Sequence, residues 1–95
     1  MDFSRDLRAG VLSGSITVSF RLWHRPQVKP GGRYQVGDGH IVVDSVEQVP
    51  FSDISEADLR RTGDPDLESL RRRAAQSGPI HDDTPLYRIG FHAAE

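Results

Sequence analysis

Cysteine is absent from this 95-residue chain, and no long apolar run occurs in it. Without cysteine the protein has no disulfide, no thiolate zinc site and no cysteine nucleophile. No apolar stretch approaches the roughly 20 residues that cross a bilayer, which argues against a membrane protein. Residues 1–5 lack the apolar core of a signal peptide. A small domain without disulfides is typical of the cytoplasm, and we predict that location.

The residues that are present predict one globular domain over residues 1–95. Apolar residues make up 36% and charged residues 27% of the chain, which is the balance of a folded protein rather than a disordered one. A chain of this length buries only about 60–65% of the surface that its unfolded form exposes. The core is therefore small, and an open cleft is a more plausible binding site than an enclosed pocket.

Charge is distributed unevenly along the chain, although the net charge is only −2. Residues 7–37 contain cations and no acid, whereas residues 38–58 contain acids and no lysine or arginine. One interpretation is a basic face that attracts nucleic acid. The other is that the two segments pair in the fold and cancel. The cations of the first segment are Arg8, Arg21, Arg25, Lys29 and Arg33.

The first elements are read from the spacing of apolar residues. Phe3, Leu7 and Val11 recur at helical spacing, which predicts a helix over residues 3–12 that ends at Gly14 in a left-handed cap. Residues 15–23 alternate strictly and predict a half-buried strand. Its apolar row is Ile16, Val18, Phe20 and Leu22, and its polar row is Thr17, Ser19, Arg21 and Trp23.

The middle of the chain predicts further strands. A loop is expected over residues 26–32, a short strand over 33–36 and a tight turn over 37–39. A strand over residues 40–49 should carry an irregularity near Ser45, where the alternation breaks.

The last third predicts two short helices and a closing strand. Ser55 begins the first helix, and Asp64 and Pro65 are expected to begin the second as its N-cap and first residue. This second helix should stop at residues 77–79, and its expected apolar stripe is Leu67, Leu70 and Ala74. A strand over residues 86–92 should direct Tyr87, Ile89 and Phe91 to one face. This order of elements predicts an α+β fold, a small and mostly antiparallel barrel.

The segment Gly14-x-Ile16-x-x-Ser19-x-Arg21 resembles the signature of ASCH domains, G-x-K-x-x-T-x-R, at the same junction of helix and first strand. Gly14 and Arg21 match, Ser19 keeps the hydroxyl of the threonine, and Ile16 replaces the lysine. Residues 39–46, 49–55 and 86–91 also resemble the family. The resemblance implies a PUA-like barrel with a cleft beside the signature, which binds RNA, a nucleotide or a modified nucleoside.

Candidate ligand-binding residues lie on the polar row of the first strand and in the loop after it. A guanidinium such as that of Arg21 can grip phosphate or carbonyl groups with two hydrogen bonds. The alternative role for it is a surface salt bridge. Aromatic rings between cations are typical of single-stranded RNA binding, although core packing is their commoner role. The candidates are Ser19, Arg21, Thr17, Trp23, Arg25, Lys29 and Arg33.

Catalysis is the less favoured interpretation of the same residues. Ser19 is a candidate nucleophile, but it needs a base to accept its proton. The resemblance implies that the signature lysine serves this purpose in amidohydrolase members, and Ile16 cannot. Glu68 is a candidate carboxylate for such an amidohydrolase or for a ribonuclease. Its alternative role is an i, i+4 pair with Arg72 on a solvated helix face.

Nothing in the sequence predicts a metal site or a cofactor. The four histidines are scattered without the spacing of a ligand pair, and no phosphate-binding glycine loop is present. A further alternative is a protein-interaction or regulatory domain, in which the acidic segment 38–58 contacts a partner.

Overall fold

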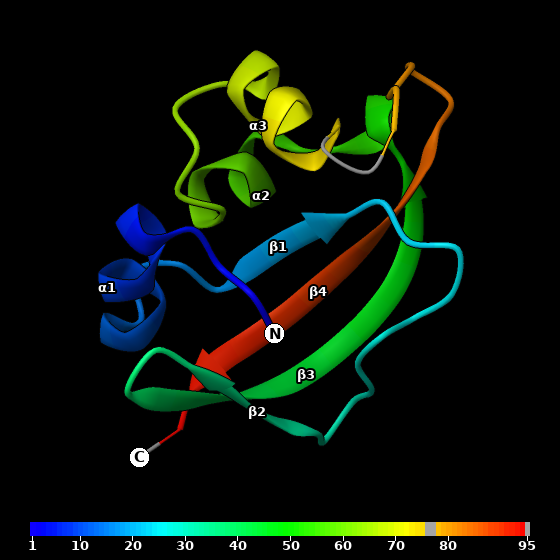
Figure 1. Cartoon of the computed structure of the whole chain (residues 1–95). Coiled ribbons are helices and arrows are strands. Elements are labelled where there is room, and N and C mark those ends of the chain that lie inside the picture. Colours follow the sequence, from blue (N-terminus) through cyan, green and yellow to red (C-terminus); the bar gives the residue numbers. More distant parts are fainter. Residues whose placement is uncertain (76–77, 95) are drawn as a thin grey trace.

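The computed structural model describes residues 1–75 and 78–94 of the chain (Figure 1). Helices stand at one end and one side of a curved sheet, and the N-terminal residues cross in front of that sheet. The elements are α1 (Arg5–Ser13), β1 (Val18–Arg21), β2 (Arg33–Val36), β3 (Gly39–Pro50), the 3-10 turn η1 (Phe51–Asp53), α2 (Glu56–Arg61), α3 (Leu67–Ala74) and β4 (Pro85–Ala93).

The four strands form one sheet in the order β1-β4-β3-β2, and all neighbours are antiparallel. The register of β3 against β4 shifts between Val43 and Ser45, which confirms the predicted irregularity. The α+β class and the antiparallel sheet are also confirmed. The barrel is not, because β1 and β2 remain the two edges of an open sheet within the described residues.

The junction between helix α1 and strand β1 is as predicted: Gly14 ends the helix, and alternating burial follows it. Gly14 caps α1 with φ 89°, a left-handed conformation that glycine adopts without a steric cost. In β1 and just before it, Ile16, Val18 and Phe20 are buried and form the apolar row. The helix begins at Arg5, so Phe3 precedes it but still packs into the same core as Val11.

The two inserted helices are present, with one correction to their boundaries. Ser55 caps α2 by accepting a hydrogen bond from the amide of Asp58 at 3.0 Å. The N-cap of α3 is Asp66, which accepts from the amide of Ser69 at 2.8 Å, so the prediction of Asp64 as N-cap and Pro65 as first helical residue is wrong. Both aspartates suit a cap, and Asp64 has another partner.

The end of α3 and its apolar stripe are also only partly as expected. The helix ends at Ala74, and Ser77 of the predicted stop lies outside the described residues. Leu70 is buried and Ala74 packs against the core, but Leu67 is 41% exposed. The inward face of α3 therefore runs through Leu70 and Ala74.

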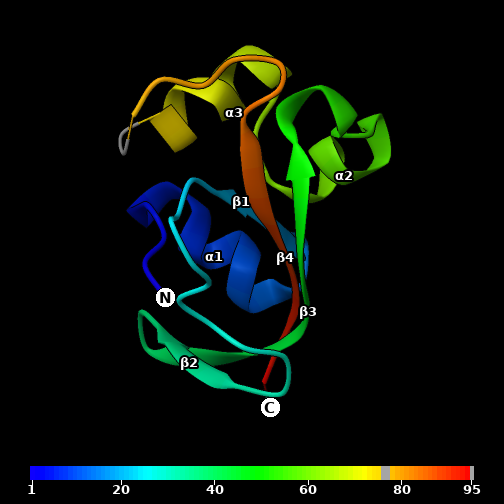
Figure 2. The same cartoon turned by 90° about the vertical axis from the view of Figure 1, so that its right-hand side faces the viewer.

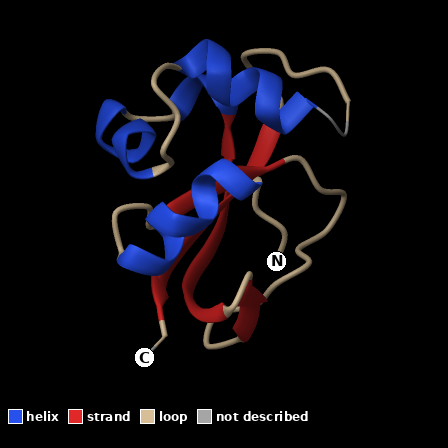
Figure 3. Ribbon diagram, turned by 60° about the vertical axis from the view of Figure 1, so that its left-hand side comes forward, coloured by secondary structure: helices blue, strands red, loops and turns tan. Residues whose placement is uncertain are grey.

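Two apolar clusters make up the core. They lie beneath helices α1 and α3, whose positions against the sheet can be followed in Figures 2 and 3. The first lies between α1 and the sheet and includes Val11, Ile41 and Phe91. The second lies under α3 and η1 and includes Phe20 and Leu86. Strand β4 serves both: Tyr87, Ile89 and Phe91 pack in the first cluster, as predicted, and Leu86 packs in the second.

Candidate functional site

A cleft of about 300 Å³ opens where the two apolar clusters meet. It lies between β1, the N-terminal residues and α3. Phe3 and Leu7 line it from the first cluster, and Phe20 and Leu70 line it from the second. The polar and aromatic lining residues are Asp2, Ser4, Ser19, Arg21, Trp23, Thr62, Asp64 and Arg73.

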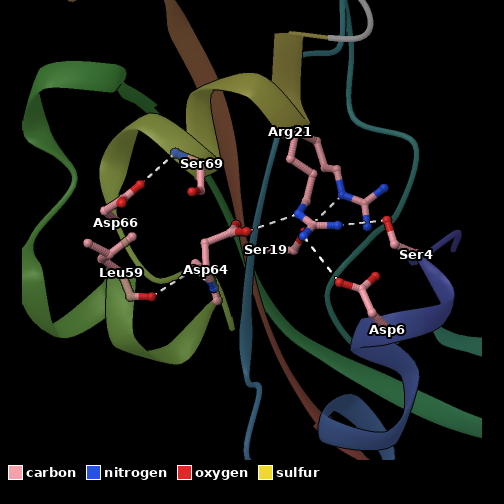
Figure 4. A network of polar contacts seen from close by, with 10 residues as sticks. Ser4, Asp6, Ser19, Arg21, Leu59, Asp64, Asp66 and Ser69 are labelled. Atoms are coloured by element: carbon pink, nitrogen blue, oxygen red, sulfur yellow. Dashed lines mark hydrogen bonds and ion pairs between the residues drawn. The ribbon is translucent and has the colours of Figure 1, made fainter.

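Ser19 and Arg21 are adjacent in this cleft because residues two apart on a strand share a face. The Nε of Arg21 donates a hydrogen bond to Ser19 Oγ at 2.8 Å (Figure 4). This bond fixes the plane of the guanidinium. Its terminal nitrogens are therefore held in place for other acceptors in the cleft.

The N-terminal residues supply the other contacts of Arg21. Its Nη2 donates to the carbonyl oxygen of Asp2 at 2.6 Å, and its guanidinium carbon lies 4.9 Å from the centre of the Phe3 ring. Burial lowers the pKa of Arg21, the Asp2 charge raises it, and the nearby Arg73 lowers it further. The cation is thus partly desolvated, which strengthens any electrostatic contact that it makes.

Arg73 is a second guanidinium in the cleft, and it joins three segments of the chain. Its Nε donates to Asp64 Oδ1 at 3.0 Å, and its Nη1 donates to Ser4 Oγ at 2.7 Å. Its Nη2 lies 3.6 Å from Asp6 Oδ2. The Ser4 hydroxyl is therefore not used to cap α1, for which Ser4 is the N-cap residue.

The two arginines differ in how their charges are balanced. Arg73 forms ion pairs with Asp64 and Asp6, whereas Arg21 forms none among the described residues. The Asp64 side chain is only 4% exposed; it lines the cleft, and its Oδ1 accepts from Arg73. The cleft therefore presents a cationic donor group at Arg21 and an anionic acceptor at Asp64.

The structure brings together three of the predicted ligand-binding residues and separates the others. Ser19, Arg21 and Trp23 line the cleft, and Trp23 packs against Tyr87 with ring centres 6.2 Å apart. Thr17 is half-buried, directly precedes β1 and does not line the cleft. The loop and β2 cations are exposed outside the cleft; these are Arg25, Lys29 and Arg33.

The weak catalytic candidate Glu68 is also outside the cleft. It is exposed on α3, and its expected ion pair with Arg72 is not formed in the described part of the chain. Ile16, which stands where the ASCH signature has lysine, is 6% exposed and packs close to Gly10 and Gly63. Ser19 Oγ is bonded to Arg21, and no carboxylate or imidazole of the described residues is hydrogen-bonded to it.

Sequence reasoning missed the contribution of Arg73, Asp64 and the N-terminal residues. A signal for Arg73 was available, since it follows buried Leu70 by three positions and so lies on the inward face of α3. No comparable signal exists for Ser4, because its bond to Arg73 spans 69 positions and depends on tertiary packing.

The basic and acidic segments do not pair with each other. Among the described residues, none of the cations in residues 7–37 forms an ion pair with an acid in residues 38–58. Two of these acids instead contact residues of strand β4: Asp58 pairs with Arg88 at 2.8 Å, and Asp44 lies 2.9 Å from His92. The mutual-cancellation interpretation is therefore wrong at the level of direct ion pairs.

Residues 1–75 and 78–94 contain neither a candidate metal site nor a candidate membrane-spanning helix. They contain no group of three or more histidine, aspartate or glutamate side chains arranged to hold a metal ion. They also contain no helix that is both long and apolar enough to cross a membrane.

Solved structures that share this fold include two bacterial proteins. One is a protein of Enterococcus faecalis assigned to the family model DUF984, with TM-score 0.71 and 18% identity over 94% of this chain and 70% of that chain. The other is an ASCH domain from Lactobacillus crispatus, with TM-score 0.70 and 15% identity over 93% of this chain and 70% of that one. No family model matches the sequence, and no curated protein matches it. The likeness shows that this chain has an ASCH-like fold.

Proposed function

We propose that this domain binds a nucleotide, free or within RNA, in the cleft beside β1. The observation that carries the proposal is the state of Arg21: a partly desolvated guanidinium, fixed by Ser19, that forms no ion pair in the described chain. Such a group favours an anionic or carbonyl oxygen acceptor over water. A phosphate oxygen or a base carbonyl fits this requirement.

The balance of positive and negative side chains in the cleft restricts the class of ligand further. The lining contains two arginines, Arg21 and Arg73, and two aspartates, Asp2 and Asp64, so it does not attract anions merely by excess charge. It suits a ligand that carries both acceptors and donors. Nucleotides have this character, since phosphate and carbonyl oxygens accept while amino and imino groups donate.

The size and apolar lining of the cleft support a ligand of about one nucleoside. Its volume of about 300 Å³ lies at the lower end of small-molecule pockets. Trp23, which is half-buried, provides ring surface at its wall, on which a base can stack. The ASCH-like fold supports the proposal too, because the family resemblance implies ligands of this kind.

Binding is favoured over hydrolysis by two observations. No base among the described residues is hydrogen-bonded to Ser19 to accept its proton, and the buried Ile16 leaves no ionisable group at the lysine position of the signature. A nucleotide-binding module requires neither of these groups, whereas an amidohydrolase or a ribonuclease needs an acid-base group beside the ligand.

A fluorescence titration of Trp23 tests the proposal, since this is the single tryptophan and it lines the cleft. The titrants are a short single-stranded RNA and, separately, the four nucleoside 5′-monophosphates. We expect a saturable change whose midpoint rises with added salt for the RNA, because phosphate binding releases counterions. No saturable change with any titrant would refute the proposal. It would favour the alternative that the acidic segment 38–58 contacts a protein partner.

A further inference from the structure

A second cleft adjoins the first on the far side of Arg21. It measures about 290 Å³, and it shares Asp2, Arg21 and Trp23 with the first cleft. These three residues therefore form a boundary that is common to both clefts. The remaining residues that line the second cleft are Met1, Gln27, Val28 and Tyr34.

The loop that walls the second cleft is anchored at several points. Val28 is buried in the first apolar cluster, and the amide of Lys29 donates to Tyr34 Oη at 2.9 Å. The amide of Gly31 donates to the carbonyl of Val43 at 2.7 Å, which fixes the end of the loop to β3. The second cleft is therefore a pre-formed feature, and a ligand would lose little free energy in ordering it.

The chemistry of the second cleft resembles that of a base-binding site in single-stranded RNA recognition. Trp23 and Tyr34 offer aromatic surface, and the exposed Gln27 carries an amide that can both donate to and accept from a base edge. Arg25 and Lys29 are exposed on the same loop, and neither forms an ion pair in the described residues. Cations of this kind suit the phosphates that flank a bound base.

From this arrangement we propose that the two clefts together bind two consecutive nucleotides of a single-stranded RNA. The first base occupies the cleft against α3, the second base lies against Trp23 and Tyr34, and Arg21 at the shared boundary holds the phosphate between them. This inference rests on the proposed function, and it assigns RNA rather than a free nucleotide as the ligand.

The boundary also contains one repulsive group, the carboxylate of Asp2. Its carbonyl oxygen already accepts from Arg21, and its side chain is exposed. A bridging phosphate would lie near this negative charge. Removal of the charge should therefore strengthen binding of the two-nucleotide ligand.

The test compares four 5′-phosphorylated homodinucleotides with the four matching nucleoside 5′-monophosphates by isothermal titration calorimetry. For at least one base we expect the dinucleotide to bind roughly tenfold more tightly, since each stacked base contributes that order of affinity. Gln27→Glu places a carboxylate in the second cleft. It should remove most of this gain and leave mononucleotide affinity within about twofold of the unaltered protein.

The matched control is Gln48→Glu, which adds the same charge at an exposed position of β3 outside both clefts. It should change neither affinity. Equal affinities for every dinucleotide and its mononucleotide, or equal weakening of both by Gln27→Glu, would overturn the two-nucleotide inference and leave the proposed function standing. Absence of binding by all eight compounds would overturn both.

Discussion

Replacement of Arg21 by alanine should separate the binding role of this residue from its structural one. The change removes the hydrogen bonds to Ser19 Oγ and to the Asp2 carbonyl, together with the cation–π contact to Phe3. Both former partners can take up water, because neither is sealed in the core. We therefore expect a loss of about 1–2 kcal/mol in the free energy of unfolding, and a folded protein.

The effect on ligand affinity should be larger. A hydrogen bond from a charged donor contributes about 1.5–3 kcal/mol, and no other unpaired guanidinium lines the first cleft in the described chain. Loss of this contact corresponds to about 10- to 150-fold weaker binding of a nucleoside monophosphate. Arg21→Lys keeps the charge and loses the planar guanidinium with its paired donors. Its ligand affinity should therefore fall between that of the original protein and that of Arg21→Ala.

The assay is calorimetric titration with the monophosphate that binds best, paired with thermal unfolding of each variant. The control is Arg60→Ala, since Arg60 is exposed on α2 and pairs with Glu56 only at 3.9 Å. It should alter neither quantity measurably. Unchanged affinity in a folded Arg21→Ala protein would refute the assignment of the site.

Three other changes test separate parts of the account. Asp2→Asn removes a negative charge beside Arg21 and should raise nucleotide affinity about two- to fivefold in a calorimetric titration. Ile16→Lys places an amine in a packed core position and should cost about 2–4 kcal/mol in urea denaturation. Asp58→Asn breaks the bidentate ion pair with Arg88 and should lower the free energy of unfolding by about 1–3 kcal/mol at pH 7.

The pH dependence of the last change follows from the hydrogen bonds that Arg88 donates, which lower the pKa of Asp58. A carboxyl group with a lowered pKa stabilises the fold above its unfolded pKa of about 3.9, and that contribution is lost as the pH falls through the folded value. The stability difference between the original protein and Asp58→Asn should therefore be full above about pH 4 and shrink below it. A difference that stays constant down to pH 2 would contradict this assignment.

The other two changes have equally clear contrary outcomes. An unaltered or weaker affinity of Asp2→Asn would show that its carboxylate does not face the bound ligand. Full stability of Ile16→Lys would show that position 16 has access to the cleft, and an amidase assay of that variant would then be the next experiment.

Much of the fold was predictable because its elements follow local patterns. Helix α1 and its Gly14 cap, the alternation along β1 and the irregularity near Ser45 each depend on neighbouring residues. The prediction failed where two residues competed for one local role, as at Asp64 and Asp66. The predicted barrel is not confirmed, because closure of a sheet depends on how its edge strands meet rather than on either strand alone.

The candidate site was predictable only along β1. Ser19 and Arg21 share a face by the two-residue period of a strand, so their proximity follows from the sequence. Arg73, Asp64 and Ser4 come from three other segments and meet in space through the packing of α1 and α3. The polar balance of the cleft, which narrows the ligand class, therefore required the tertiary structure.

The central claim is that the cleft beside β1 is the ligand site, and backbone amide NMR during a titration with short single-stranded RNA tests it most directly. The account predicts that the largest shift changes fall on Ser19, Arg21 and Trp23 and on the amides near Asp64. Changes confined to the acidic residues 38–58, or no changes at all, would contradict it.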